Sequence, residues 1–314
     1  MKAFALESAD RPARTIDIPK PKVGEADALV AVKAASVNGI DVYQAMGALI
    51  GMLEHSYPTV VGRDFAGIVE SVGPGFGGFA VGDDLFGFIP TIPPLKSGAF
   101  AEYVVGGSAL VLARKPAGLS FADASALPLA GSAALDLLDA IAAKKGDVVL
   151  IVGATGGVGS FAVQLAAQRG LTVIATALPD QDKYVRELGA TETIDYSAGS
   201  VSDAVRSRYP EGIAALIDVV NQKEALSELA SLVRPGGHVA TLMGAADIEL
   251  LASRGIGGTN VMAAPTAEKL SLLGELASSG ALRVQIHGAY PIDRTDEALQ
   301  AFQRGTRGKV VLTF

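Results

Sequence analysis

The 314-residue sequence contains no cysteine. Disulfides, thiol nucleophiles and thiolate zinc sites are therefore excluded. Histidine is scarce as well. His55, His238 and His287 are scattered along the chain without an i, i+4 pair, so we interpret each as a surface or hydrogen-bonded side chain rather than a ligand. The sequence predicts no metal site.

The chain also lacks a basic cluster, and its 33 acidic residues outnumber 26 basic ones for a net charge of −7. This balance disfavours nucleic acid and anionic membrane surfaces as main partners. The N-terminal apolar run is too short for a signal peptide, because Glu7 and Asp10 follow directly. We expect a cytoplasmic protein that binds no membrane.

The pattern of predicted secondary structure changes along the chain. Up to about residue 115, short β-type runs at 28–37, 60–72, 100–105 and 109–113 alternate with glycine and proline turns, which is typical of an irregular β domain. From Ser120 a capping box predicts one long helix to about Ala143. Strands at 148–152, 171–176, 214–220 and 238–243 then alternate with helices at 158–168, 181–188 and 222–233. This order predicts an α/β fold with a doubly wound parallel sheet. We further expect a strand at 259–263, helices at 266–279 and 296–304, and a closing strand at 309–314.

The most informative segment is a glycine-rich turn between the strand 148–152 and the helix 158–168. It consists of Gly153, Ala154, Thr155, Gly156, Gly157, Val158 and Gly159. Glycines let the backbone approach a pyrophosphate closely, and the helix N-terminus presents unpaired N–H groups to the anion. The pattern departs from G-x-G-x-x-G, because Ala154 stands where the first glycine would be. We interpret the segment as a dinucleotide site. The alternatives are a plain buried strand and helix, or a membrane span, since residues 148–168 carry no charge.

Several further motifs recur in a specific order and spacing. They are Ala35–Tyr43, Val61–Val69, Val81–Gly87, Gly98–Tyr103, Leu127–Ala133, the glycine turn, and Arg307–Leu312. Over nearly its whole length the chain resembles the zinc-free quinone oxidoreductase or zeta-crystallin-like branch of the medium-chain dehydrogenase/reductase superfamily. The resemblance implies a GroES-like β-rich catalytic domain at 1–117, completed by 281–314, and a Rossmann NADPH-binding domain at 118–280. The active cleft is expected between the two domains.

The resemblance also implies the reaction. A nicotinamide would transfer hydride to a quinone, or to the C=C of an α,β-unsaturated carbonyl such as an enone, enal or enoyl thioester. Two alternatives stay open: a non-catalytic NADPH-binding protein of the zeta-crystallin type, and a reductase of simple carbonyls. Where zinc-dependent relatives place their ligands, this chain has Asn38, Gly39 and Arg63, so catalysis without zinc is expected.

Without a metal, the site needs hydrogen-bond donors for the acceptor oxygen, which gains negative charge. In the family that the chain resembles, the segment containing Asn38 and Tyr43 lines the substrate cleft, so we predict an amide donor and a phenolic donor or proton source there. A helix N-cap at Asn38 and a half-buried packing ring at Tyr43 are the structural alternatives. Asp41 matches the motif too but could cap or pair locally, and Asp64 is interpreted as structural.

The cofactor prediction is NADPH. NAD-specific folds carry a carboxylate at the end of the second strand, whereas this chain has Thr176 there, with Lys183 and Tyr196 as partners for a 2′-phosphate. Asp180 and Asp182 complicate this interpretation, since they could face the ribose. By analogy, Ser132 positions the nicotinamide carboxamide and Gly244 leaves room beside the ring. We also expect a homodimer, joined antiparallel through the sheet edge at 259–263.

Overall fold

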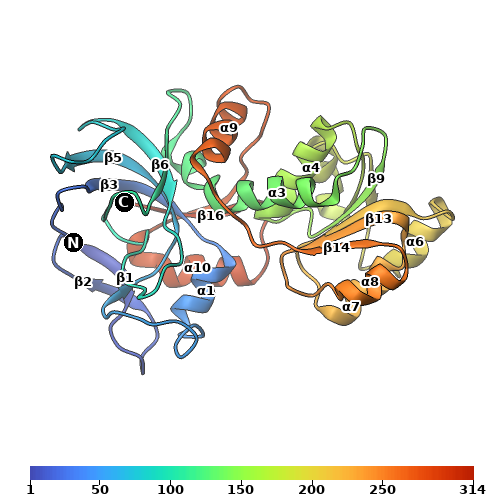
Figure 1. Ribbon diagram of the computed structural model, residues 1–314, viewed down its shortest axis with the longest axis horizontal. Helices are drawn as coiled ribbons and strands as arrows, with labels where there is room; N and C mark the ends of the chain where they lie inside the picture. Colours follow the sequence, from blue (N-terminus) through green and yellow to red (C-terminus); the bar gives the residue numbers. More distant parts are fainter. The chain divides into compact units, whose positions relative to one another are not determined.

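The computed structural model describes residues 1–314, which form two compact units. The first consists of Met1–Leu129 together with Pro265–Phe314, and the second of Ala130–Ala264. Figure 1 labels the helices and strands of both. The first unit extends beyond the expected domain 1–117 plus 281–314, chiefly because α9 (Ala267–Ser278) packs against it, with Gly274 facing Phe86 and Pro116.

The first unit is built on two β-sheets. The small sheet has the order β2 (Arg14–Asp17), β1 (Lys2–Leu6), β4 (Thr59–Val60). The large sheet has the order β15 (Ile286–Pro291), β16 (Lys309–Thr313), β3 (Ala28–Ser36), β5 (Asp64–Val72), β6 (Asp84–Phe88), β8 (Val111–Arg114), and β7 (Tyr103–Gly106) also pairs with β3. Its core is apolar and includes Phe65, Leu85 and Phe100. The C-terminal strand thus completes a sheet begun near the N-terminus.

Strand register in this sheet places the polar residues of interest. β3 and β5 are antiparallel, with Ser36 directly opposite Asp64. β16 runs antiparallel on the other side of β3, and the Val37 amide donates to the Val310 carbonyl. Helix α1 (Gly39–Ala45) follows β3 directly. The end of β3, the beginning of β5 and the beginning of β16 therefore lie together at one edge.

The second unit is the predicted doubly wound parallel sheet. Its order is β11 (Glu192–Ile194), β10 (Thr172–Thr176), β9 (Val148–Val152), β12 (Ile213–Asp218), β13 (Val233–Thr241), β14 (Gly257–Asn260). The helices are α3 (Pro128–Ile141, which begins in the first unit), α4 (Gly157–Gln168), α5 (Asp182–Glu187), α6 (Val201–Arg208), α7 (Lys223–Ala230) and α8 (Ile248–Ser253). Figure 1 shows α4 on one face of this sheet and α7 and α8 on the other. Both faces are covered, which explains why β9 and β12 are almost wholly apolar.

Several expectations about elements need correction. The strand expected at 238–243 is β13, which begins five residues earlier, and the helix expected at 222–233 is α7, which ends at Ala230. The single helix expected from Ser120 to Ala143 is two, α2 (Phe121–Ser125) and α3, because Pro128 lacks an N–H and disfavours helical geometry in the preceding residue. The Ser120 cap itself is present, its side chain accepting from the Asp123 amide. The membrane alternative for 148–168 is wrong, since that segment is β9, the turn and α4. None of the helices combines the length and apolar character that crossing a bilayer requires. The edge strand expected at 259–263 is β14, two residues earlier.

The remaining helix of the first unit, α10 (Thr295–Gln303), packs its apolar side against β15 and β16. Ala298 and Leu299 are buried there. This packing holds the C-terminal strand in place beside β3, and with it Lys309.

Candidate active site

The glycine turn has the geometry that a bound pyrophosphate requires. Gly153 has φ +81°, and a Cβ there would lie 2.5 Å from Val220 Cγ2. A Cβ at Gly159 would lie 2.1 Å from the Gly153 carbonyl oxygen. Larger residues are therefore excluded at both positions. Gly156 is the N-cap of α4 and provides no side-chain hydrogen bond, so the first N–H groups of this helix remain for an anion.

The remaining residues of the turn differ in how far they are buried. Ala154 is fully buried, whereas Thr155, Gly157 and Val158 are partly exposed. Thr176, at the end of β10, is buried, and its hydroxyl oxygen accepts from the Gly153 amide at 3.3 Å. Thr176 therefore supports the turn, which is a contact that the sequence did not predict.

Ser132 and Gly244 are the two residues predicted to lie beside the nicotinamide. The Ser132 side chain is fully buried in α3, and its hydroxyl has no hydrogen-bond partner. A buried polar group without a partner is unfavourable by about 1–3 kcal/mol, so a bound carboxamide would relieve a real deficit. Gly244 has φ +64°, and no atom lies within 4 Å of the position of its missing Cβ. The second unit therefore contains a buried hydroxyl without a partner at Ser132 and open space at Gly244.

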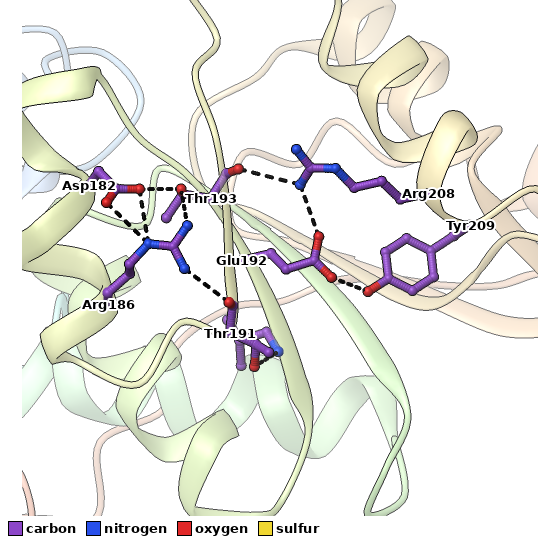
Figure 2. Close-up of polar contacts among 8 residues, drawn as sticks. Asp182, Arg186, Thr191, Glu192, Thr193, Arg208 and Tyr209 are labelled. Carbon is purple, nitrogen blue, oxygen red and sulfur yellow. Dashed lines mark hydrogen bonds and ion pairs between the residues drawn. The ribbon is translucent and has the colours of Figure 1, made fainter.

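A polar network surrounds the edge strand β11 (Figure 2). Arg186 Nε donates to both carboxylate oxygens of Asp182 at 3.1 Å, and its Nη2 donates to Thr193 Oγ1 at 2.9 Å. The Thr193 hydroxyl also donates to Asp182, and with Arg186 this lowers the pKa of that carboxyl. On the other side of the strand, Arg208 and Tyr209 both donate to Glu192. The negative charge of Asp182 is thus compensated within the protein.

The predicted 2′-phosphate partners lie next to this network and remain accessible. The Lys183 side chain is 89% exposed, with its ammonium 3.8 Å from Glu187. Tyr196, two residues after β11, is 51% exposed. Arg186 is bonded to Asp182 and Thr193, whereas Lys183, paired with Glu187, is the more exposed cation of α5.

In the first unit, Asn38 is both the N-cap of α1 and part of a buried polar cluster. Its side-chain nitrogen donates to Asp64 Oδ2 at 2.9 Å, and its side-chain oxygen accepts from Lys309 Nζ at 2.5 Å. Asp64 accepts further hydrogen bonds from Ser36 Oγ and from the Leu129 amide. Sequence reasoning missed Lys309. The available signal was a lysine that opens an otherwise apolar strand.

Asp41 and Arg63 belong to the same cluster and are fully buried. Asp41 Oδ2 accepts from the Asn38 backbone amide at 2.8 Å, whereas its Oδ1 has no partner. Burial, and then the charge of Asp64, raise the pKa of Asp41 to about 7. Arg63 donates from Nη2 to Gln44 Oε1 at 2.9 Å, and burial lowers its pKa.

Tyr43, by contrast, lies on the exposed side of α1, with 56% of its surface accessible. Such exposure fits both the predicted phenolic donor and a half-buried packing ring. Each of the three histidines has a hydrogen bond, His55 with the Leu53 carbonyl, His238 with Thr259 and His287 with the Arg307 amide. The structure contains no group of three or more His, Cys, Asp or Glu side chains that could hold a metal ion.

Comparison with known proteins identifies the family. Residues 24–116 match the alcohol dehydrogenase GroES-like domain, and residues 157–251 match the zinc-binding dehydrogenase domain. The chain is 31% identical to 2-methylene-furan-3-one reductase of Solanum lycopersicum, over 94% of this chain and 74% of that protein. It is 28% identical to the chloroplastic NADPH-dependent alkenal/one oxidoreductase of Arabidopsis thaliana, over the same shares. Among solved structures, the quinone oxidoreductase of Coxiella burnetii superposes with a TM-score of 0.89 at 29% identity, over 100% of this chain and 99% of that one. The chain belongs to the quinone oxidoreductase branch of the medium-chain dehydrogenase/reductase superfamily, a family of oxidoreductases that use a nicotinamide cofactor.

Proposed function

We propose that this protein is an NADPH-dependent reductase that transfers hydride to a quinone or to the C=C of an α,β-unsaturated carbonyl, without zinc. The observation that carries the proposal is the glycine turn, in which Gly153 and Gly159 bring the backbone to the position of a pyrophosphate at the uncapped start of α4. The names of the relatives support the acceptor class, because they include an enone reductase, an alkenal/one oxidoreductase and a quinone oxidoreductase.

Each part of the cofactor has residues to hold it in this proposal. The turn from Gly153 to Gly159 binds the pyrophosphate, Ser132 binds the carboxamide, and Gly244 leaves room beside the ring. Lys183 and Tyr196 bind the 2′-phosphate, which selects NADPH over NADH. When bound, the cofactor supplies a hydride from nicotinamide C4.

The acceptor oxygen gains negative charge as hydride arrives, and two donors of α1 and its N-cap meet that charge. Asn38 has one side-chain N–H bonded to Asp64, which leaves a second N–H for the acceptor oxygen. Tyr43 supplies a phenolic O–H, and we propose that it delivers the proton that completes the reduction. Its exposure allows the phenolate to recover a proton from solvent.

Turnover of variants tests this assignment. Deleting a donor that acts on developing charge lowers kcat by on the order of 10²-fold and changes KM little. Asn38→Ala and Tyr43→Phe are therefore expected to lose kcat on both quinones and enones. Tyr57→Phe is the matched control, since Tyr57 is a partly exposed tyrosine of the same unit outside α1. If Tyr43→Phe keeps full activity, solvent supplies the proton instead.

The proposal also covers the assembly. β14 is the last strand of its sheet and pairs only with β13, so its outer edge is available for another copy. We propose a homodimer joined there, in which the two β14 strands pair antiparallel about a two-fold axis.

A further inference from the structure

The Asn38 side chain lies between two buried charges that do not bond to each other. Lys309 Nζ donates to its oxygen at 2.5 Å and to the Val37 carbonyl at 2.9 Å. Its nitrogen donates to Asp64 at 2.9 Å. Lys309 and Asp64 are each less than one-twentieth exposed, and both lie at the strand edge where β16 and β5 begin. The order of contacts is thus ammonium, amide, carboxylate.

This order fixes which way the amide points. An ammonium can only donate and a carboxylate can only accept, so rotating the amide by half a turn would break both hydrogen bonds. Burial raises the pKa of Asp64, whereas its partners favour the ionised form, because Ser36 Oγ, Asn38 Nδ2 and the Leu129 amide all donate to it. The orientation of Asn38 is therefore determined by charge and not by shape alone.

The ammonium also changes how strongly the amide can donate. A cation bonded to the amide oxygen draws electron density from the nitrogen, and hydrogen bonds in such a chain strengthen one another, more so where water is excluded. One of the two amide hydrogens is bonded to Asp64. The second amide hydrogen has a fixed direction, because the amide cannot rotate, and it is made more positive by Lys309. A fixed, polarised donor of this kind needs no reorganisation when charge develops on an acceptor.

We propose that Lys309 is a positioning residue of the reductase, which acts on the acceptor oxygen through the Asn38 amide by fixing its orientation and increasing the positive charge on its remaining N–H. This inference rests on the proposed function, which gives Asn38 an acceptor to bind. It assigns a role to the lysine of the C-terminal strand, 271 positions from Asn38 in the sequence. It also explains why a lysine is buried at the start of an apolar strand.

The test compares two buried lysines of the same unit. Lys309→Met removes the ammonium beside Asn38. Lys115→Met is the control, because the Lys115 side chain is 5% exposed, donates to the Leu119 carbonyl at 2.9 Å and pairs with Asp84 at 3.2 Å, without contacting Asn38. We expect Lys309→Met to lower kcat by on the order of 10-fold, less than loss of a direct donor, with the Kd for NADPH unchanged. Lys115→Met is expected to lower Tm while kcat is retained, and Lys309→Arg to recover part of kcat.

A coupling measurement separates positioning from a merely structural role. If Lys309 acts through Asn38, Lys309→Met costs no further kcat in an Asn38→Ala background. Should Lys309→Met fail to fold because the buried charge of Asp64 loses the nearby ammonium, the neutral pair Asp64→Asn with Lys309→Met replaces it in both backgrounds. The inference is overturned if the lysine variant keeps kcat as Lys115→Met does, or if its loss adds in full to that of Asn38→Ala. An inactive wild-type protein would instead overturn the proposed function.

Discussion

Asp182 and Arg186 lie one turn apart on α5, and the Arg186 guanidinium donates to both carboxylate oxygens of Asp182. Thr193 of the edge strand β11 accepts from Arg186 and donates to Asp182. Asp180 and Asp182 both complicate a 2′-phosphate at this end of the sheet, because a carboxylate facing the ribose would repel it, and Asp182 is paired with Arg186. The pairing removes much of that repulsion. It also occupies Arg186, so the proposed selection of NADPH assigns the 2′-phosphate to Lys183.

Lys183→Met is therefore expected to raise the Kd for NADPH on the order of 10-fold and to leave the Kd for NADH unchanged, since only NADPH carries the ribose 2′-phosphate. Fluorescence titration with both cofactors measures this directly. Lys223→Met, on α7, removes a similar exposed ammonium whose partner is Asp247 and should change neither Kd. Equal loss of affinity for both cofactors would contradict the assignment.

The buried carboxyl of Asp41 predicts a pH dependence of stability. Its pKa is about 7 in the folded chain, against an ordinary 3.8. Between these two pH values the carboxyl is therefore protonated in the folded chain and ionised in the unfolded chain. The stability contributed by this group is complete below about pH 4 and is lost as pH rises through 7. Asp41→Asn removes the titration. Its free energy of unfolding should therefore rise relative to wild type between pH 5 and pH 8.

Asp83 provides the control for that measurement. Hydrogen bonds from the Ala80 amide and from Arg114 lower its pKa, so its contribution is lost only as pH falls and is complete above about pH 5. The difference between Asp83→Asn and wild type should stay constant from pH 5 to 8. A constant difference for Asp41→Asn as well would show that Asp41 is ionised throughout.

Removal of metal tests the zinc-free mechanism. Arg63 stands where a zinc-ligand histidine is expected in zinc-dependent relatives. Its guanidinium is buried and donates to Gln44. We expect activity to survive exhaustive chelation and elemental analysis to find less than stoichiometric zinc. One zinc per chain, lost together with activity, would contradict this mechanism.

Much of the fold could be predicted because its signals are local. The strand Val148–Val152 and the helix after it follow from an apolar run, a glycine turn and a second apolar run. The break at Pro128 was missed because a strong cap at Ser120 and a long apolar pattern outweighed one proline. The short strand β11 escaped prediction because three residues give too little alternation to detect.

In the candidate site, too, the local features could be predicted and the contacts between distant segments could not. The residues of the glycine turn are contiguous, so their spacing alone predicted a site for a dinucleotide. The cluster around Asn38 is assembled from the ends of three strands, and Lys309 meets it only through the antiparallel pairing of β16 with β3. No pattern in a single sequence shows such a contact. The pairing of Asp182 with Arg186 could have been predicted from their i, i+4 spacing.

The homodimer prediction concerns the edge of β14. Met262, just beyond that strand, is 90% exposed. Light scattering at micromolar concentration should report twice the mass of the chain, and Met262→Lys should weaken the dimer, because a charged side chain at a strand edge opposes pairing with another strand. A wild-type monomer at that concentration would refute the proposed interface.

The central claim is hydride transfer from the nicotinamide to an electron-poor carbon, and isotope transfer tests it most directly. NADPH deuterated at C4, on the face from which hydride leaves, is oxidised with a simple enone, and the product is examined by mass spectrometry and NMR. Hydride transfer to the enone places one deuterium at the β-carbon of the saturated ketone, with the α-hydrogen taken from solvent or Tyr43. An allylic alcohol deuterated at the carbinol carbon, or a saturated product without deuterium, would contradict the central claim.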